Sequence, residues 1–511
     1  MHNTMTPPRA GRREWIGLAV LILPLLLVSM DVSVLYFTVP FISRDLAPSS
    51  TEQLWIFDIY GFVLAGFLIT MGALGDRVGR RRLLMIGALG FSAASALAAY
   101  SSSAPMLIGA RAVLGVAGAT LMPSTLALIR NMFHDEKQRS TAIAVWTAVM
   151  TCGIALGPIV SGLLLEHFWW GSVFLINVPA MVLLLALAPI LLPEYRNSGR
   201  GRFDLASAML SIAAVVPVIW GIKEIAAHGA DVTRTAAIVA GLVIAAVFIR
   251  RQQRRPDPML DLAVLRRPAF AGSVVVSLLA TFAMIGFAVL STQYLQLVLG
   301  MSPLKGALWS LVPSVGVGAA APIASTLARR GVDRARIIAA GFLVAAGGFA
   351  LLSAVPVESG LWVLLVGSGM YAAGLVVVLS TATELAVGTV PPERAGASSA
   401  LMETATEFGG ALGIAILGSI ATAVYRTQLG DHVPGPARET LGGAVVTAEQ
   451  LPSAAATGLL QSAREAFVAS MHTVVWTSAA IMLLAAAVAL TCLRGVATPR
   501  QAAEPELLAK A

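Results

Sequence analysis

The chain has 511 residues, of which 57% are hydrophobic and only 12% are charged, and its mean hydropathy is +0.82. Soluble domains carry about 25% charged residues, so this shortage indicates that lipid is the main solvent of the chain. The formal net charge of +8 comes mostly from Lys and Arg in loops on one side of the predicted spans, which indicates membrane topology and excludes a nucleic-acid-binding face. The two cysteines, Cys152 and Cys492, lie far apart in apolar segments and predict neither a disulfide nor a metal site.

Apolar runs long enough to cross a bilayer, which takes about 20 residues, recur along the whole chain. The first run is too long for a signal peptide, so we expect it to remain as an uncleaved helix. The basic loops should face the cytoplasm, which places both termini there and the chain in a bacterial cytoplasmic membrane. We predict fourteen spans, at 16–42, 52–75, 81–101, 105–129, 140–165, 171–192, 204–225, 234–251, 270–298, 304–328, 334–355, 360–386, 396–425 and 466–493.

A basic, glycine-rich turn follows the second span, directly after Met71. Its order, G-x-L-G-D-R-x-G-R-R, resembles the signature loop between helices 2 and 3 of the major facilitator superfamily. The alternative interpretation is an ordinary cytoplasmic turn. The resemblance implies a role in conformational gating for Gly72, Asp76, Arg77, Gly79, Arg80 and Arg81.

Two further stretches resemble motifs of the same superfamily. The fifth span contains C-G-I-A-L-G-P-I-V-S-G, which resembles the antiporter motif G-x-x-x-G-P-x-x-G-G of exporting members, with Ser161 in place of one Gly. In the fourth span, Arg111 and Gly115 fit the pattern R-x-x-x-G that the family links to proton transfer, although Leu114 replaces the expected Gln. Glycines spaced by four allow close helix approach, and a proline bends the helix. The residues of the fifth-span motif are Gly153, Gly157, Pro158 and Gly162.

The first span, around Asp31 and Pro40, resembles the first-span motif of the 14-span branch. The chain as a whole resembles the 14-span drug/proton antiporters, close to bacterial exporters of quaternary ammonium compounds and dyes. In those relatives, carboxylates in spans 1, 2 and 13 serve protons and cationic drugs, which implies such roles for Asp31, Asp58 and Glu407.

The resemblance also implies an all-α membrane protein with the major facilitator fold, two six-helix halves and two inserted central helices. A faint internal repeat, A-L-G-x4-G at Ala155–Gly162 and again at Ala411–Gly418, agrees with two halves. A long outer loop is expected at 426–465, part of it along the membrane surface. The expected domains are 1–200, 201–265 and 266–511.

Charged side chains inside spans are functional candidates by default, because inserting one costs about 2.5–3.5 kcal/mol. A rise of about 1.5 Å per residue places Asp31, Asp58 and Arg111 at a common depth in the outer half of the membrane. Arg111 stays charged, so it needs a carboxylate, and Asp31 or Asp58 is the expected partner. The alternative is a static polar cluster that holds spans 1, 2 and 4 together. The candidates are Asp31, Asp58, Arg111, Glu384, Glu403 and Glu407.

Glu403 and Glu407 are four residues apart, so they share one face of span 13. Two carboxylates this close in a low dielectric should not both be charged, which suits a proton carrier and a lipophilic cation alike. The alternative is that Glu403 reaches cytoplasmic water, as Glu384 at the inner end of its span should do. Aromatic and flexible side chains should line a cavity for such cations, or else pack between helices or face lipid. These are Trp55, Tyr60, Trp146, Phe282, Met284 and Tyr371.

We therefore predict a secondary active exporter that exchanges lipophilic, often cationic drugs, antibiotics or dyes for protons by alternating access. It should work as a monomer with no cofactor. The sequence contains no G-x-x-x-x-G-K-[ST] loop, which argues against ATP drive, and no mid-span histidine cluster that would suit a membrane enzyme. Two alternatives stay open. One is an importer, which the fifth-span motif disfavours, and the other is a dedicated self-resistance exporter for one antibiotic or metabolite.

Overall fold

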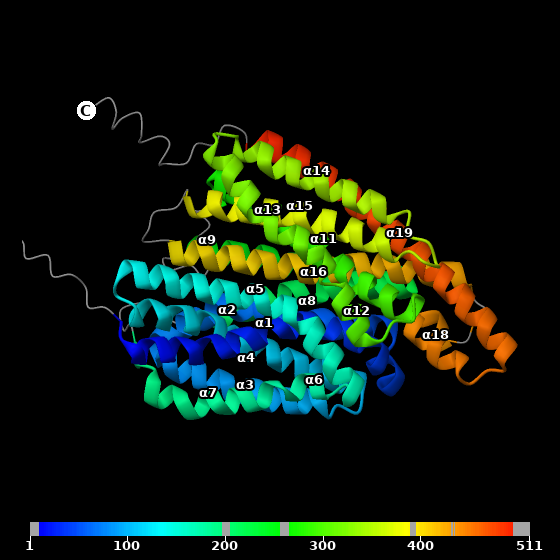
Figure 1. Cartoon of the computed structure of the whole chain (residues 1–511), viewed down its shortest axis with the longest axis horizontal. Coiled ribbons are helices and arrows are strands. Elements are labelled where there is room, and N and C mark those ends of the chain that lie inside the picture. Colours follow the sequence, from blue (N-terminus) through cyan, green and yellow to red (C-terminus); the bar gives the residue numbers. More distant parts are fainter. Residues whose placement is uncertain are drawn as a thin grey trace, which may run out of the picture.

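The computed structural model describes residues 10–196, 205–255, 265–388, 395–430, 433 and 435–493. All regular structure in these ranges is helical, and the long helices run side by side along one direction (Figure 1), which confirms the predicted all-α membrane fold. Within the same ranges, twelve segments are long and apolar enough to cross a membrane, or thirteen if the bent pair Ser50–Leu68 and Thr70–Val78 is one span. The count of fourteen therefore stays a prediction.

The first group of helices surrounds one apolar core, which is built mainly from residues between Leu18 and Leu192 and also includes Val289, Ala307 and Ile414 of later helices. Polar residues start several of these helices, because their side chains accept a hydrogen bond from an otherwise unpaired amide. Ser49 does so at the start of α2, Ser103 at α4 and Asp135 at α5. The helices are α1 (Arg12–Leu46), α2 (Ser50–Val78), α3 (Arg80–Ala99), α4 (Ala104–Met132), α5 (Glu136–His167), α6 (Ser172–Leu175) and α7 (Asn177–Leu191).

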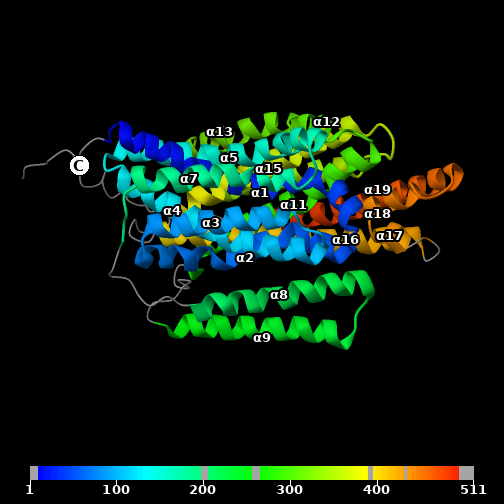
Figure 2. The same ribbon diagram turned by 90° about the horizontal axis from the view of Figure 1, so that it is seen from below.

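Two helices stand apart from both large groups. They are α8 (Leu205–His228) and α9 (Val232–Arg254), which pack against each other as a hairpin along one side of the bundle (Figure 2). The helix α8 contacts α2 and also α16, a helix of the later group. The hairpin therefore touches the bundle where helices from the first and last parts of the chain meet.

The later helices surround a second apolar core, which extends from Ala269 to Leu493. One turn of π-helix, η1 (Tyr294–Val298), interrupts the sequence of α-helices, and such turns are frequent at functional sites. The α-helices are α11 (Pro268–Gln293), α12 (Pro303–Trp309), α13 (Val312–Arg329), α14 (Arg334–Leu352), α15 (Leu361–Gly388), α16 (Ala395–Leu429), α17 (Gly435–Glu439), α18 (Leu441–Ala448) and α19 (Ser453–Cys492).

The predicted outer loop is shorter and more ordered than expected. The last helix begins at Ser453, well before the expected start of its span at residue 466, and the loop before it contains the short helices α17 and α18. We call the end of the bundle that carries these two helices the outer end, following the predicted topology. There Ser50 donates two hydrogen bonds to the Glu439 carboxylate, and Arg44 forms an exposed ion pair with Glu449. The loop thus joins the first helix group to the second.

Other contacts at the outer end also join the two groups. Gln296 of η1 donates a hydrogen bond of 3.0 Å to the backbone carbonyl of Phe37 in α1. Ser302, before α12, donates one of 2.9 Å to Glu166 near the end of α5. The outer end is therefore closed by direct contacts between helices from the two halves of the sequence.

Candidate functional site

Asp31 of α1 and Arg111 of α4 form a buried ion pair near the centre of the first group. One Arg111 nitrogen lies 3.0 Å from Asp31 Oδ2, and each side chain is only 1% exposed. The other terminal nitrogen donates to the backbone carbonyl of Phe57, and the guanidinium lies 5.3 Å from the ring centre of Tyr60. Of the two carboxylates expected near Arg111, the structure places Asp31 beside it.

Asp58 of α2 pairs instead with Lys223 of α8. The Lys223 ammonium lies 2.7 Å from Asp58 Oδ2 and 2.9 Å from Oδ1, and both side chains are fully buried. The same ammonium lies 3.9 Å from the ring centre of Trp55, over its face. Lys223 was not among the candidates taken from the sequence. The signal that could have found it is its charge inside a predicted span, at a depth close to that of Asp58.

Glu403 and Glu407 lie on α16, and both are partly buried. In the part of the chain that the structure describes, neither carboxylate has an ion-pair or hydrogen-bond partner. Glu407 is close enough to the phenols of Tyr36 in α1 and Tyr60 in α2 to interact with them electrostatically. It therefore faces the region where the two helix groups meet. A carboxylate there without a cation is a place where a proton or an organic cation can bind.

Glu384, the last acidic candidate, has a different environment. Its carboxylate lies 2.7 Å from Arg334, and its side chain is 48% exposed. It is thus a partly exposed ion pair near the inner end, of a kind that contributes little to stability.

The six candidate cavity residues lie in three different environments. Trp55 and Tyr60 contact the cations of the two buried ion pairs. Tyr371 stacks on Phe349 with ring centres 4.6 Å apart inside the second core, where Phe282 is also buried and Met284 packs. Trp146 of α5 donates a hydrogen bond of 3.1 Å to Thr125 of α4. Only Trp55 and Tyr60 therefore lie directly against charged groups of the site.

The glycines of the fifth-span motif lie where α5 approaches other helices closely. A Cβ atom at Gly153 would lie 2.8 Å from the carbonyl oxygen of Leu26, and one at Gly157 would overlap Ser33, both in α1. A Cβ atom at Gly162 would lie 2.7 Å from Cα of Leu304 in α12. Ser161, which replaces one glycine of the motif, is buried and donates a hydrogen bond to the backbone carbonyl of Val34. Pro158 lies inside the same helix.

The basic turn between α2 and α3 is held by contacts within the first group. Gly79 has φ +112°, a conformation that favours glycine, and Asp76 pairs with Arg80 at 2.6 Å. Arg81 donates from its backbone amide to Glu194, which follows α7, and from its side chain to the carbonyl of Leu192. Gly72 approaches Pro123 of α4, and Arg77 is exposed. The turn thus ties α2 and α3 to the end of α7.

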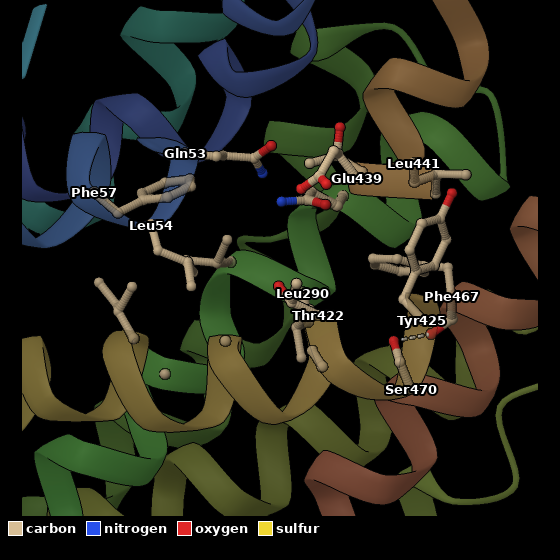
Figure 3. Close-up of a pocket in the computed structure, with 17 residues that line it drawn as sticks. Gln53, Leu54, Phe57, Leu290, Thr422, Tyr425, Glu439, Leu441, Phe467 and Ser470 are labelled. Carbon is tan, nitrogen blue, oxygen red and sulfur yellow. Dashed lines mark hydrogen bonds between the residues drawn. The ribbon is translucent and has the colours of Figure 1, made fainter. Parts of the chain in front are cut away.

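A small pocket opens at the outer end between α2, α11, α16 and the outer loop (Figure 3). Gln53 and Phe57 of α2 form one wall, Tyr425 of α16 lies on the opposite side, and Glu439 of α17 lies beside Gln53. The Glu439 carboxylate is 3.4 Å from Arg426, so its charge is partly balanced. This pocket lies between the two helix groups, on the outer side of the ion pairs.

Comparisons with known proteins agree with this arrangement. A profile described as the Major Facilitator Superfamily matches residues 21–414. The chain is 43% identical to "Multidrug efflux pump LfrA" of Mycolicibacterium smegmatis, covering 96% of this chain and 98% of that protein. It is 35% identical to "Methyl viologen resistance protein SmvA" of Salmonella typhimurium, with coverage of 93% and 97%. It is 32% identical to "Tetracenomycin C resistance and export protein" of Streptomyces glaucescens, with coverage of 94% and 91%.

A solved structure shows the same fold. It is a bacterial homologue of the human lysosomal transporter Spinster, in an inward-facing and unoccupied conformation. The two chains superpose with a TM-score of 0.67 at 16% identity, over 96% of this chain and 100% of the other. At this identity the likeness concerns the fold alone.

Proposed function

This chain belongs to the major facilitator superfamily, and from that premise we propose that it is a proton-driven exporter of lipophilic, often cationic drugs, antibiotics or dyes. The observation that carries the proposal is the Glu407 carboxylate, which faces the meeting of the two helix groups without a cation beside it among the described residues. The similarity to proteins named as an efflux pump and a resistance protein supports export. The chain is a membrane transporter.

Glu407 and its neighbour Glu403 form the exchange point in this mechanism. A buried carboxylate is costly to charge, so it holds a proton until a cation takes the proton's place. A lipophilic cation that arrives from the cytoplasm or the inner leaflet binds the charged form, and the proton leaves. After the halves tilt, a proton from outside replaces the cation, which is released. Tyr36 and Tyr60 lie within electrostatic reach of this carboxylate.

Four other buried charged side chains form two ion pairs. Asp31 neutralises Arg111, and Asp58 neutralises Lys223, so neither pair needs a proton in this conformation. Protonation of Asp31 would free Arg111 to turn toward another acceptor, and in this way the pair can transmit the state of the central carboxylates to α1 and α4.

The closed outer end supports alternating access. In this conformation α5 meets α12 through Gly162, and the outer loop contacts the turn between α1 and α2. The structure therefore represents a state that is closed at its outer end. The two apolar cores support moving halves at 1–200 and 266–511, with 201–265 as an insertion. Both termini lie in the cytoplasm, the chain works as a monomer, and its membrane is the bacterial cytoplasmic membrane.

A dedicated exporter for one antibiotic is a second candidate. The relative from Streptomyces glaucescens, whose name combines resistance to tetracenomycin C with export, favours it. Both candidates share the same exchange of substrate for protons, and they differ only in the breadth of substrates.

Purified protein in lipid vesicles tests the proposal. A pH gradient is imposed, and the movement of ethidium, a flat lipophilic cation, is followed by fluorescence. We expect ethidium to accumulate on the acidic side and to stop moving when an ionophore collapses the gradient. Ethidium movement that continues unchanged after the collapse would rule out proton exchange. Vesicles with the Glu407→Gln variant are the matched control, and they should show no gradient-driven movement.

A further inference from the structure

We propose that Lys223 is a tethered cation that occupies a lipophilic-cation site formed by Asp58 and Trp55, and that it determines which cations this site accepts. The inference rests on the proposed function, because it concerns how the chain selects cationic substrates. Lys223 belongs to α8, one of the two helices that we assign to the insertion. The insertion therefore contributes a side chain to substrate selection.

The geometry around Lys223 is that of an organic-ammonium site. Its Nζ lies 2.7 Å from an oxygen of Asp58 and 3.9 Å from the ring centre of Trp55. A carboxylate together with the face of an indole supplies charge and a π-surface, which are the two features that proteins use to bind organic ammonium groups. The protein's own ammonium thus takes the place that a substrate cation would otherwise fill.

Apolar contacts already hold α8 against the bundle without this ion pair. Ile219 of α8 clusters with Phe62 of α2 and with Ala415 of α16, and Ile212 packs tightly on Gly66. Burial of an ammonium and a carboxylate costs several kcal/mol per ion in real proteins, and well-packed apolar residues usually replace such a pair without loss. An anchoring role alone therefore does not explain why two charges are buried here.

The Lys223 site lies on a different face of α2 from the direct contacts of Arg111, although Arg111 is within electrostatic reach of Asp58. Trp55, Asp58 and Phe62 lie three and four residues apart on α2, so they share the face that points to α8 and α16. The contacts to Arg111 come from other positions of α2, the Phe57 carbonyl and the Tyr60 ring. The Asp58 site lies on the seam between α2 and α16, which belong to different halves and change their contact when the halves tilt.

Competition with a tethered ammonium makes the site selective. A group on a short flexible tether acts at an effective concentration of about 1 mM. A small monocation competes poorly against it, whereas a flat aromatic cation gains additional stacking on Trp55. Lys223 therefore excludes common small cations from Asp58 and admits polyaromatic ones.

The test measures ethidium binding to the purified full-length protein in detergent, by fluorescence anisotropy at mildly alkaline pH. Lys223→Met removes the tethered cation but keeps a flexible apolar side chain in its place. We expect this variant to bind ethidium about tenfold more tightly, the order of one cation–π contact in a dry site. Lys223→Arg keeps a cation in the site and should bind like the wild type. Lys305→Met, which removes an exposed positive charge on α12, is the matched control and should also bind like the wild type.

An Asp58→Asn background separates this role from a structural one. There the tethered ammonium no longer competes for a carboxylate, so adding Lys223→Met should leave ethidium affinity unchanged. A tenfold gain that persists in this background overturns the inference. Equal affinity of the wild type and Lys223→Met also overturns it, while gradient-driven ethidium export by the wild type would leave the proposed function in place. A wild type that neither binds nor exports ethidium contradicts both.

Trp55→Leu is a second variant that keeps both charges and hence the ion pair. Its fold is therefore not threatened by an uncompensated buried charge, and the result does not depend on whether Lys223→Met folds. We expect ethidium to bind about tenfold more weakly, because one wall of the site is lost. Unchanged affinity in this variant overturns the inference.

Discussion

Removing the charge of Asp31 should destabilise the protein strongly. The Arg111 nitrogen lies 3.0 Å from the Asp31 oxygen, and both side chains are almost fully buried. At an effective dielectric constant of about 20, Coulomb's law gives a gross attraction of about 5 kcal/mol at this distance. The Asp31→Asn variant leaves Arg111 charged and buried, with the Phe57 carbonyl and the Tyr60 ring as its remaining contacts and Asp58 as a more distant negative charge. We expect a loss of about 3–5 kcal/mol in the free energy of unfolding.

A double-mutant cycle measures this effect. Unfolding in mixed micelles is followed for the wild type, Asp31→Asn, Arg111→Gln and the double variant. Because the double variant buries no charge at this position, we expect it to lie within about 2 kcal/mol of the wild type. Ethidium export should be absent in all three variants if the pair transmits protonation. An Asp31→Asn protein as stable as the wild type would show that Arg111 does not depend on Asp31, because another charge or water would then stabilise it.

Two further predictions concern the closed outer end. Gly162→Ala should lower ethidium export at least about tenfold without loss of folded protein, because the added Cβ would lie 2.7 Å from the Leu304 backbone and hold α5 away from α12. Gly109→Ala is the matched control, since a Cβ there meets no atom within 4 Å, and equal export by both variants would contradict the assigned closure. Glu439→Gln should raise the rate of trypsin cleavage at the outer loop several-fold, because the ion pair to Arg426 is lost and the bonds from Ser50 weaken. Glu449→Gln should change this rate little, since its pair with Arg44 is exposed, and identical cleavage of the two variants would show that Glu439 does not hold the loop.

The sequence predicts the helices well because the bilayer imposes their length. Every predicted span coincides with one or two helices of the structure, since about 20 apolar residues are needed wherever the chain crosses lipid. The exact number of spans is harder to settle. The helix α8 carries Lys223 near its end and is not among the twelve candidate segments, and α2 is bent by 49° around residue 69.

The partners of the buried charges depend on tertiary packing. The estimated depth along each helix predicted that Asp31, Asp58 and Arg111 lie close together. Depth does not determine which face of its helix each residue occupies. Asp58 points to α8, and its partner Lys223 lies 165 residues away in the chain. A lysine near the end of an apolar run is ordinarily expected to reach water along its stem, which is why the sequence did not single it out.

The outer loop and the aromatic candidates show a similar limit. The short helices α17 and α18 form where the loop contacts α1, α16 and α19, as in the hydrogen bond from Tyr425 to the Ala437 carbonyl. The segment that was expected along the membrane surface also buries Gly442 and Ala444 against the protein. Phe282 and Tyr371 are of the residue type that often lines cavities for cations, yet both pack within the second core. Aromatic side chains serve both purposes, and only packing distinguishes them.

Proton release on ethidium binding shows whether a carboxylate on α16 exchanges a proton for a cation. Purified protein in weakly buffered detergent solution is mixed with ethidium, and the change in pH is recorded. We predict that the wild type releases protons in proportion to ethidium bound, and that Glu407→Gln releases far fewer at the same occupancy. Ethidium binding without proton release in the wild type, or equal release by Glu407→Gln, would contradict the account.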